Sequence, residues 1–209
     1  MSATYKLDRT QGVLFDAGGR RFDPHLRAWI DTAAPTTGDL VGSIAAASWL
    51  QRQSGAPMRV PVGVIGPREA SSAQLLVAQN VGCGLATMGF VVICGGRHGV
   101  MEAVCRGAAE AGGLTIGLLP DADPSFANPH VGIVIATGMG EARNALIARA
   151  SLCLVAIGDS FGTLSEVALG RQFGKRVIGL EGAARVEGVI HVATVEQALD
   201  EVAQCALAA

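Results

Sequence analysis

From residue 60 onward, the chain alternates short, wholly apolar runs with longer segments in which apolar residues recur at helical spacing. Runs that are apolar at every position are typical of strands buried on both faces, and their alternation with helices is typical of a parallel sheet. The runs predict strands at 60–66, 90–94, 114–118, 131–136, 152–157, 176–180 and 189–192. The intervening segments predict helices at 72–88, 100–111, 141–150, 163–173 and 195–208. We therefore expect an α/β fold: a Rossmann-like, doubly wound, mostly parallel sheet with helices on both faces.

Composition excludes several classes of protein. Half of the 209 residues are apolar and 16% are charged, which is typical of a globular chain rather than a disordered one. The net charge is −2 and no basic stretch occurs, so we expect no nucleic-acid partner. Every apolar run is interrupted before it reaches the length of a membrane span, so we expect no membrane partner.

The cysteines and the first residues predict the compartment. The five cysteines include no CxxC pair, and four of them lie inside apolar runs, so we interpret them as buried free thiols. Free thiols are typical of a reducing compartment. Residues 1–8 lack the basic and then apolar pattern of a signal peptide. We therefore expect a cytoplasmic protein.

The first 59 residues differ from the rest of the chain. Residues 13–22 predict two short extended pieces around a Gly18-Gly19 turn, and weak helical character follows at 26–32 and 44–53, with a loop at 35–38 between them. Both tryptophans of the chain lie in this segment. We expect an N-terminal extension at 1–59, packed on the main domain or at an interface, and a Rossmann-like phosphate-binding domain at 60–209.

Three loops follow predicted strands at the edge of the sheet where ligands bind in such folds. They occupy residues 66–72, 95–101 and 158–163. Glycines there let a ligand approach the backbone, and the free N–H groups of the helices that follow attract anions. Tight packing of helix on strand is the alternative explanation for the glycines. The ligand candidates on these loops are Gly66, Arg68, Gly95, Gly96, Arg97, His98, Gly99, Gly158, Asp159, Ser160, Gly162 and Thr163.

Two charged residues stand beside these loops. Glu166 lies in the helix that follows Gly162-Thr163, where a carboxylate either caps the free N–H groups of its own helix or performs acid–base chemistry. Arg143 lies near the start of a predicted helix, where a cation opposes the helix dipole. Either Glu141 compensates this charge, or the guanidinium of Arg143 faces a phosphate or carboxylate.

Three segments of the chain resemble the Lonely Guy family, which was long misannotated as lysine decarboxylases and whose superfamily includes molybdenum-cofactor carrier proteins. They are Gly95-Gly96-Arg97-His98-Gly99 with the residues that follow, Arg143-Asn144, and Gly162-Thr163-Leu164-Ser165-Glu166. The resemblance covers residues 60–180, and Arg143 precedes Glu166 by 23 residues, which is similar to the family's interval. It implies a Rossmann fold, Arg143 and Glu166 as the catalytic pair, and a 5′-phosphate held by the glycines and Thr163.

The chain also departs from the family's motifs. Gly158-Asp159-Ser160 stands where the family has Pro-Gly-Gly, and Asn144 stands where it has lysine. Asp159 repels a phosphate unless it is turned away, paired or bound to a cation. These differences resemble the uncharacterised nucleotide-binding branch of the superfamily and its cofactor carriers, and we include Asn144 among the ligand candidates.

Three functions therefore stay open, so the sequence leaves enzymatic activity undecided. One is a phosphoribohydrolase that releases free base and ribose 5-phosphate from a nucleoside 5′-monophosphate. The second is a non-catalytic carrier of a phosphorylated ligand, either a nucleotide or a pterin such as molybdenum cofactor. The third is a structural or regulatory oligomer. The other histidines have no metal-ligand spacing, so we expect no metal and no resident cofactor, and by resemblance we expect a homodimer or homotetramer.

Overall fold

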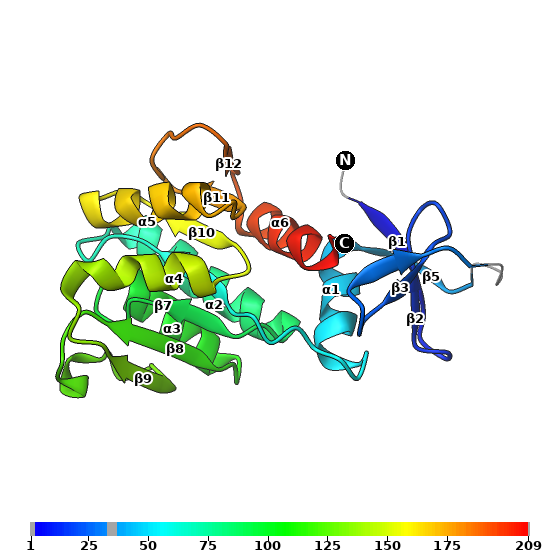
Figure 1. Cartoon of the computed structure of the whole chain (residues 1–209), viewed down its shortest axis with the longest axis horizontal. Coiled ribbons are helices and arrows are strands. Elements are labelled where there is room, and N and C mark those ends of the chain that lie inside the picture. The colour runs from blue at the N-terminus through cyan, green and yellow to red at the C-terminus, as the bar shows by residue number, and fades with distance from the viewer. Residues whose placement is uncertain (1–2, 33–36, 209) are drawn as a thin grey trace. The chain divides into compact units, whose positions relative to one another are not determined.

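A computed structural model describes residues 3–32 and 37–208 of the chain (Figure 1). Most of the loop expected at 35–38 lies outside these residues. Backbone contacts group the chain into two compact units, one formed by Met1–Arg59 with Asp200–Ala209 and the other by Val60–Leu199. The two functional domains expected from the sequence stay a prediction, and each unit is described by itself.

The larger unit is built on a seven-stranded sheet in which every pair of neighbouring strands is parallel. Its strands are β6 (Val62–Ile65), β7 (Val92–Cys94), β8 (Thr115–Leu119), β9 (Ile133–Ala136), β10 (Leu154–Ile157), β11 (Val177–Leu180) and β12 (Val189–His191). Every residue of β6, β7, β10 and β11 is buried, which agrees with the apolar runs. The expected Rossmann-like fold is confirmed.

Helices cover both faces of this sheet. Helix α2 (Ser72–Met88) packs on α3 (Val100–Glu110), and α4 (Asn144–Ala150) packs on α5 (Phe161–Gln172); the two pairs lie on opposite faces (Figure 1). Two short 3-10 helices, η1 (Pro124–Phe126) and η2 (Gly140–Arg143), flank β9 in the sequence; the last helix, α6 (Val195–Leu207), is divided between the two units at Asp200. The core under α4 and α5 contains Ile65, Ile93, Leu118, Ile147, Leu154, Val167 and Val177.

The strand order reverses beside β6. The order across the sheet is β12-β11-β10-β6-β7-β8-β9, so the chain builds outward from β6 to β9 and then returns to place β10 on the other side of β6. Loops that leave β6 and β10 depart toward opposite faces of the sheet, because crossovers between parallel strands are right-handed. A crevice therefore opens between the carboxyl ends of these two strands.

Helices α2 and α3 approach each other closely because glycines face the contact. A Cβ at Gly107 would overlap the carbonyl oxygen of Gln79, and one at Gly82 would overlap that of Val104. The N-terminus of α2 is held by a capping box: Gln74 N donates to Ser71 Oγ at 3.2 Å, and Ser71 N donates to Gln74 Oε1 at 3.0 Å. These contacts place the start of α2 directly after the loop that follows β6.

The smaller unit contains a five-stranded antiparallel sheet of order β4-β3-β2-β1-β5 and helix α1 (Ser43–Arg52). Its strands are β1 (Thr4–Asp8), β2 (Val13–Phe15), β3 (Arg21–Asp23), β4 (Ala28–Ile30) and β5 (Asp39–Gly42). The helix expected at 26–32 is wrong, because this segment pairs with β3 as strand β4. Trp29 stacks on Tyr5 at 5.7 Å between ring centroids and meets Phe22 edge-on at 4.9 Å. Packing of this aromatic side chain thus overrides weak helical propensity.

Two further expectations can be compared with the described residues. None of their helices is long and apolar enough to cross a membrane. All five cysteines are free thiols, but only three of them are buried, namely Cys94, Cys105 and Cys153. Cys83 is exposed, because it lies on the outer face of α2.

The contact between α2 and α3 yields a stability prediction. We expect Gly107→Ala to lower the free energy of unfolding by about 3 kcal/mol, because the new methyl group forces two packed helices apart. Cys83→Ala is the control: Cys83 is exposed on helix α2, and we expect a change within about 0.5 kcal/mol. Urea unfolding of both variants measures the difference. Equal stability of the two would contradict the close contact.

Candidate functional site

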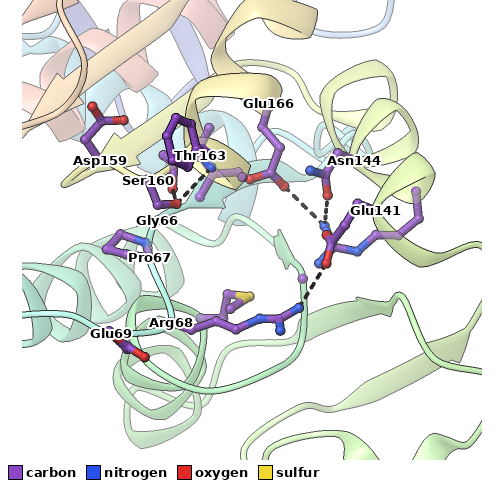
Figure 2. Close-up of a pocket in the computed structure, with 16 residues that line it drawn as sticks. Gly66, Pro67, Arg68, Glu69, Glu141, Asn144, Asp159, Ser160, Thr163 and Glu166 are labelled. Carbon is purple, nitrogen blue, oxygen red and sulfur yellow. Dashed lines mark hydrogen bonds and ion pairs between the residues drawn. The ribbon is translucent and has the colours of Figure 1, made fainter.

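A pocket of about 540 Å³ opens at the carboxyl ends of β6 and β10, where the strand order reverses (Figure 2). This volume lies within the usual range for small-molecule sites. Four segments of the larger unit contribute to it: the turn after β6, the end of β7 with the start of α3, η2 with the start of α4, and the start of α5. The lining residues are Ile65, Gly66, Pro67, Arg68, Glu69, Gly95, Met101, Glu141, Arg143, Asn144, Asp159, Ser160, Phe161, Gly162, Thr163 and Glu166.

A buried ion pair forms the floor of the pocket. Arg143 Nη1 lies 3.3 Å from Glu166 Oε1, and the exposed fractions of the two side chains are only 4% and 9%. The same Nη1 donates to Asn144 Oδ1, and Asn144 Nδ2 donates to Ser165 Oγ at 2.9 Å. Neither of the charges is solvated by bulk water, so each depends on the other and on these hydrogen bonds. The Nε atom of Arg143 is buried and has no hydrogen-bond partner among the described residues.

Burial raises the pKa of Glu166 to about 7. The positive charge of Arg143 lowers this pKa in part, whereas the negative charge of Glu141 raises it further. A carboxyl group with a pKa near 7 can donate or accept a proton at neutral pH, which suits acid–base chemistry as well as hydrogen bonding to a ligand. Glu166 does not cap its own helix, because its carboxylate accepts a hydrogen bond from Arg143 Nη1 instead.

A second ion pair crosses the mouth of the pocket. Arg68 Nη2, from the turn after β6, lies 3.2 Å from Glu141 Oε1 in η2 (Figure 2). The two side chains are 48% and 67% exposed, so the pair contributes at most about 1 kcal/mol and opens readily. Glu141 therefore does not compensate the charge of Arg143, which was one alternative from the sequence. Arg143 pairs with Glu166, and Glu141 pairs with Arg68.

The first turn of α5 presents free backbone donors to the pocket. Ser160 caps this helix: its Oγ accepts a hydrogen bond from Thr163 N at 3.1 Å and lies 2.9 Å from Thr163 Oγ1. No hydrogen bond among the described residues uses the N–H of Phe161 or Gly162, and both residues line the pocket. Free N–H groups at a helix N-terminus bind anions. Arg143 and these two donors thus form an arrangement suited to an oxyanion.

Two glycines keep this space open. A Cβ at Gly95 would lie 2.5 Å from Arg143 Nη2 and 2.7 Å from Met101 Sδ, so only glycine leaves room for the guanidinium group. A Cβ at Gly66 would lie 2.6 Å from the carbonyl oxygen of Ile157, at the end of β10. Both glycines are explained by close packing of the protein around the pocket.

Five of the ligand candidates lie outside the pocket lining. Gly96, Gly99 and Gly158 pack closely on other parts of the chain, where a Cβ would meet Gly117, Pro67 and Gln74 respectively. Arg97 Nη1 pairs with Asp121 Oδ2 at 2.5 Å, and His98 Nδ1 lies 3.2 Å from Glu102 Oε2. Of the ligand candidates on the second loop, only Gly95 lines the pocket, together with Gly162 and Thr163 of the third loop. Whether any of these residues touches a ligand stays a prediction.

The sequence reasoning missed several lining residues. The sequence predicts Glu141 only as a partner of Arg143, and it predicts no ligand contact for Phe161, Pro67 or Glu69, although all four residues line the pocket. Phe161 is 95% exposed, and an aromatic residue between a capping serine and a glycine is the signal that could have drawn attention to it. Figure 2 shows the carboxylates of Asp159 and Glu69 on the side of the pocket away from Asn144 and Glu141.

The raised pKa of Glu166 makes stability depend on pH. The folded protein retains the Glu166 proton up to about pH 7, whereas the unfolded chain loses it near the ordinary value of 4.5, so this group's stabilising contribution is lost as the pH rises through 7. Glu166→Gln removes this dependence. Between pH 5 and pH 8, we expect the variant to gain about 2 kcal/mol relative to the wild type. Urea unfolding at both pH values measures this, and parallel profiles would contradict the raised pKa.

Comparisons with known proteins agree with this architecture. A structure of the molybdenum cofactor binding protein from Rippkaea orientalis is 35% identical with a TM-score of 0.67, and the match covers 70% of this chain and 98% of that one. The molybdenum cofactor carrier protein of Chlamydomonas reinhardtii is 37% identical with a TM-score of 0.65 and the same coverage. Both are similar in sequence and fold to this chain.

Two relatives were found by sequence. An uncharacterized protein of Archaeoglobus fulgidus is 40% identical over 139 residues, which cover 66% of this chain and 91% of that protein. Cytokinin riboside 5′-monophosphate phosphoribohydrolase LOG5 of Arabidopsis thaliana is 35% identical over 79 residues, which cover 37% of this chain and 35% of that protein. The expected place in the Lonely Guy-like superfamily, on its molybdenum-cofactor-carrier branch, is confirmed. Because the model of the SLOG cluster4 family matches residues 59–207, this chain belongs to that family.

Proposed function

We propose that this chain binds a phosphorylated small molecule, either a nucleotide or a pterin cofactor, in the pocket at the strand reversal and carries it without turnover. The observation that supports this is the position of the Arg143 guanidinium in the same pocket as the free N–H groups of Phe161 and Gly162. A guanidinium fork and a helix N-terminus both prefer oxyanions.

The side chains of the pocket favour a carrier over a hydrolase. Asn144 contributes no positive charge and instead orients Arg143 through its Oδ1 atom. The hydroxyl of Ser160 is already engaged in capping α5. The molybdenum cofactor binding protein and the molybdenum cofactor carrier protein are similar to this chain in fold along 98% of their length, whereas the sequence match to the phosphoribohydrolase covers 35% of that protein. The ligand of those carriers is thus one candidate for this pocket.

Hydrolysis of a nucleoside 5′-monophosphate is the second candidate, and one observation favours it. Glu166 has a pKa of about 7 and lies beside Arg143, so it could protonate a leaving base or orient a water molecule. The two functions make different demands on Glu166, because a carrier needs it only as a hydrogen-bonding group. Release of free base from a nucleoside 5′-monophosphate therefore distinguishes the hydrolase from the carrier.

The test measures binding and turnover with the same probes. We expect the purified protein to bind either AMP, which calorimetry measures, or released molybdenum cofactor, which pterin fluorescence measures. We expect it to release no adenine, guanine or cytosine from AMP, GMP or CMP. Arg143→Met should weaken binding about tenfold, because it removes the cation without changing the side-chain volume greatly. Exposed Arg185, which lies outside the pocket, provides the control variant Arg185→Ala.

The outcomes separate the candidates. Release of base by the wild type, abolished by Glu166→Gln, would replace the carrier by the hydrolase. Equal affinity of Arg143→Met and wild type for every probe would contradict the position of the anion. Melting temperatures of all variants show whether a loss of binding reflects a loss of the fold.

We also propose that the chain forms a homodimer or homotetramer. The edge strand β9 exposes three consecutive apolar side chains, Ile133, Val134 and Ile135, with exposed fractions between 38% and 44%. An unpaired edge with an apolar surface is typical of an interface between protein chains.

This assembly can be tested by light scattering coupled to size-exclusion chromatography. We expect a mass of two or four chains for the wild type and a lower mass for Val134→Lys, because a lysine buried at an interface loses its hydration. Leu40→Lys is the control, since Leu40 is exposed on the other unit. A monomeric wild type would contradict the proposal.

A further inference from the structure

A second, smaller cavity lies between α2 and α3. Its volume is about 290 Å³, against about 540 Å³ for the main pocket. Its lining residues are Arg68, Ala70, Leu75, Gly99, Glu102, Ala103 and Arg106. We call this cavity the α2–α3 hollow. It is at the lower limit of the range for small-molecule sites, so it suits a compact group rather than a whole nucleoside.

The turn after β6 is shared by the hollow and the main pocket. Arg68 lines both cavities. The turn packs directly on the start of α3: Val100 N donates to the carbonyl oxygen of Pro67 at 3.1 Å, and Gly99 leaves room for the backbone of Arg68. The α2–α3 hollow is thus a neighbour of the proposed ligand site.

The charges that line the hollow leave an arginine without an anion. Arg106 Nη2 donates to the neutral Gln79 Oε1 at 3.2 Å, and among the described residues no carboxylate forms an ion pair with Arg106. Its Nε atom is shielded from solvent and has no hydrogen-bond partner there. Glu102, one turn earlier on α3, pairs instead with His98. Arg106 is half-buried and lines the hollow, so its guanidinium group lies beside an open space without a counter-ion among the described residues.

We propose that the α2–α3 hollow is a second anion site, built around Arg106, for a compact oxyanion such as a phosphate group. The oxyanion is either a free ion or a further phosphate of the molecule in the main pocket. An oxyanion offers several acceptor oxygens to the guanidinium group of Arg106, and the carboxylate of Glu102 opposes its binding. As a site for a free ion, the hollow is independent of the proposed carrier function; as a site for a further phosphate, it rests on the ligand proposed for the main pocket.

Titration of the full chain with inorganic phosphate, followed by calorimetry, tests the site. We expect Arg106→Gln to weaken one phosphate-binding step about tenfold, because it removes a charge and the fork. Glu102→Gln should strengthen the same step about threefold, because it removes the opposing charge. Arg185→Ala is the control, and Arg143→Met should affect only the step that belongs to the main pocket.

Titrations with AMP and ADP distinguish the two sources of the oxyanion. If the hollow holds a further phosphate of the same molecule, Arg106→Gln weakens ADP about tenfold and leaves AMP unchanged. If it holds a free ion, the variant weakens inorganic phosphate and leaves both nucleotides unchanged.

Unchanged binding of phosphate, AMP and ADP by both Arg106→Gln and Glu102→Gln would overturn the proposal. Melting temperatures report on folding. If Arg106→Gln does not fold, Glu102→Gln decides alone, since the side chain of Glu102 is one-third exposed and tolerates the change. Unchanged phosphate binding by Glu102→Gln would then reject the site. If only Arg143→Met alters phosphate binding, the anion binds in the main pocket and not in the hollow. This result would also overturn the proposal.

Discussion

The buried pair of Arg143 and Glu166 is the interaction on which the site depends. It joins the end of η2 to α5 across the crevice between β6 and β10, at 3.3 Å between Nη1 and Oε1. Two charges removed from water are stable only when geometry and further hydrogen bonds compensate their lost hydration. Asn144 accepts such a hydrogen bond from Arg143. Because the pKa of Glu166 is raised to about 7, its carboxylate can also be neutralised by binding a proton.

The surrounding backbone is shaped to admit this pair. Gly95 leaves the space that the guanidinium occupies, and Gly66 allows the turn after β6 to pass close to the end of β10. The more exposed pair of Arg68 and Glu141 then spans the mouth at little cost in free energy. A phosphate entering the pocket would therefore meet a fixed guanidinium inside and a movable one at the entrance.

Much of the larger unit was predictable because its signals are local. Wholly apolar runs that alternate with segments of helical periodicity predict a parallel sheet covered by helices on both faces. The seven strands and the helices of residues 60–209 lie close to the expected positions. The smaller unit was less predictable. Its strands are as short as three residues, and in β4 Trp29 packs on Phe22 of the neighbouring strand and on Tyr5, which is more distant in sequence.

The sequence by itself determined the fold class and the main members of the site, because periodicity, glycines at strand ends and the spacing of Arg143 and Glu166 are properties of a linear pattern. Only the tertiary structure decided which charges are partners. It brought Gly95 to the pocket while it packed Gly96 and Gly99 elsewhere, and it assigned Glu141 to Arg68 rather than to Arg143. Such choices depend on burial and on distances between segments far apart in the chain, which no local pattern encodes.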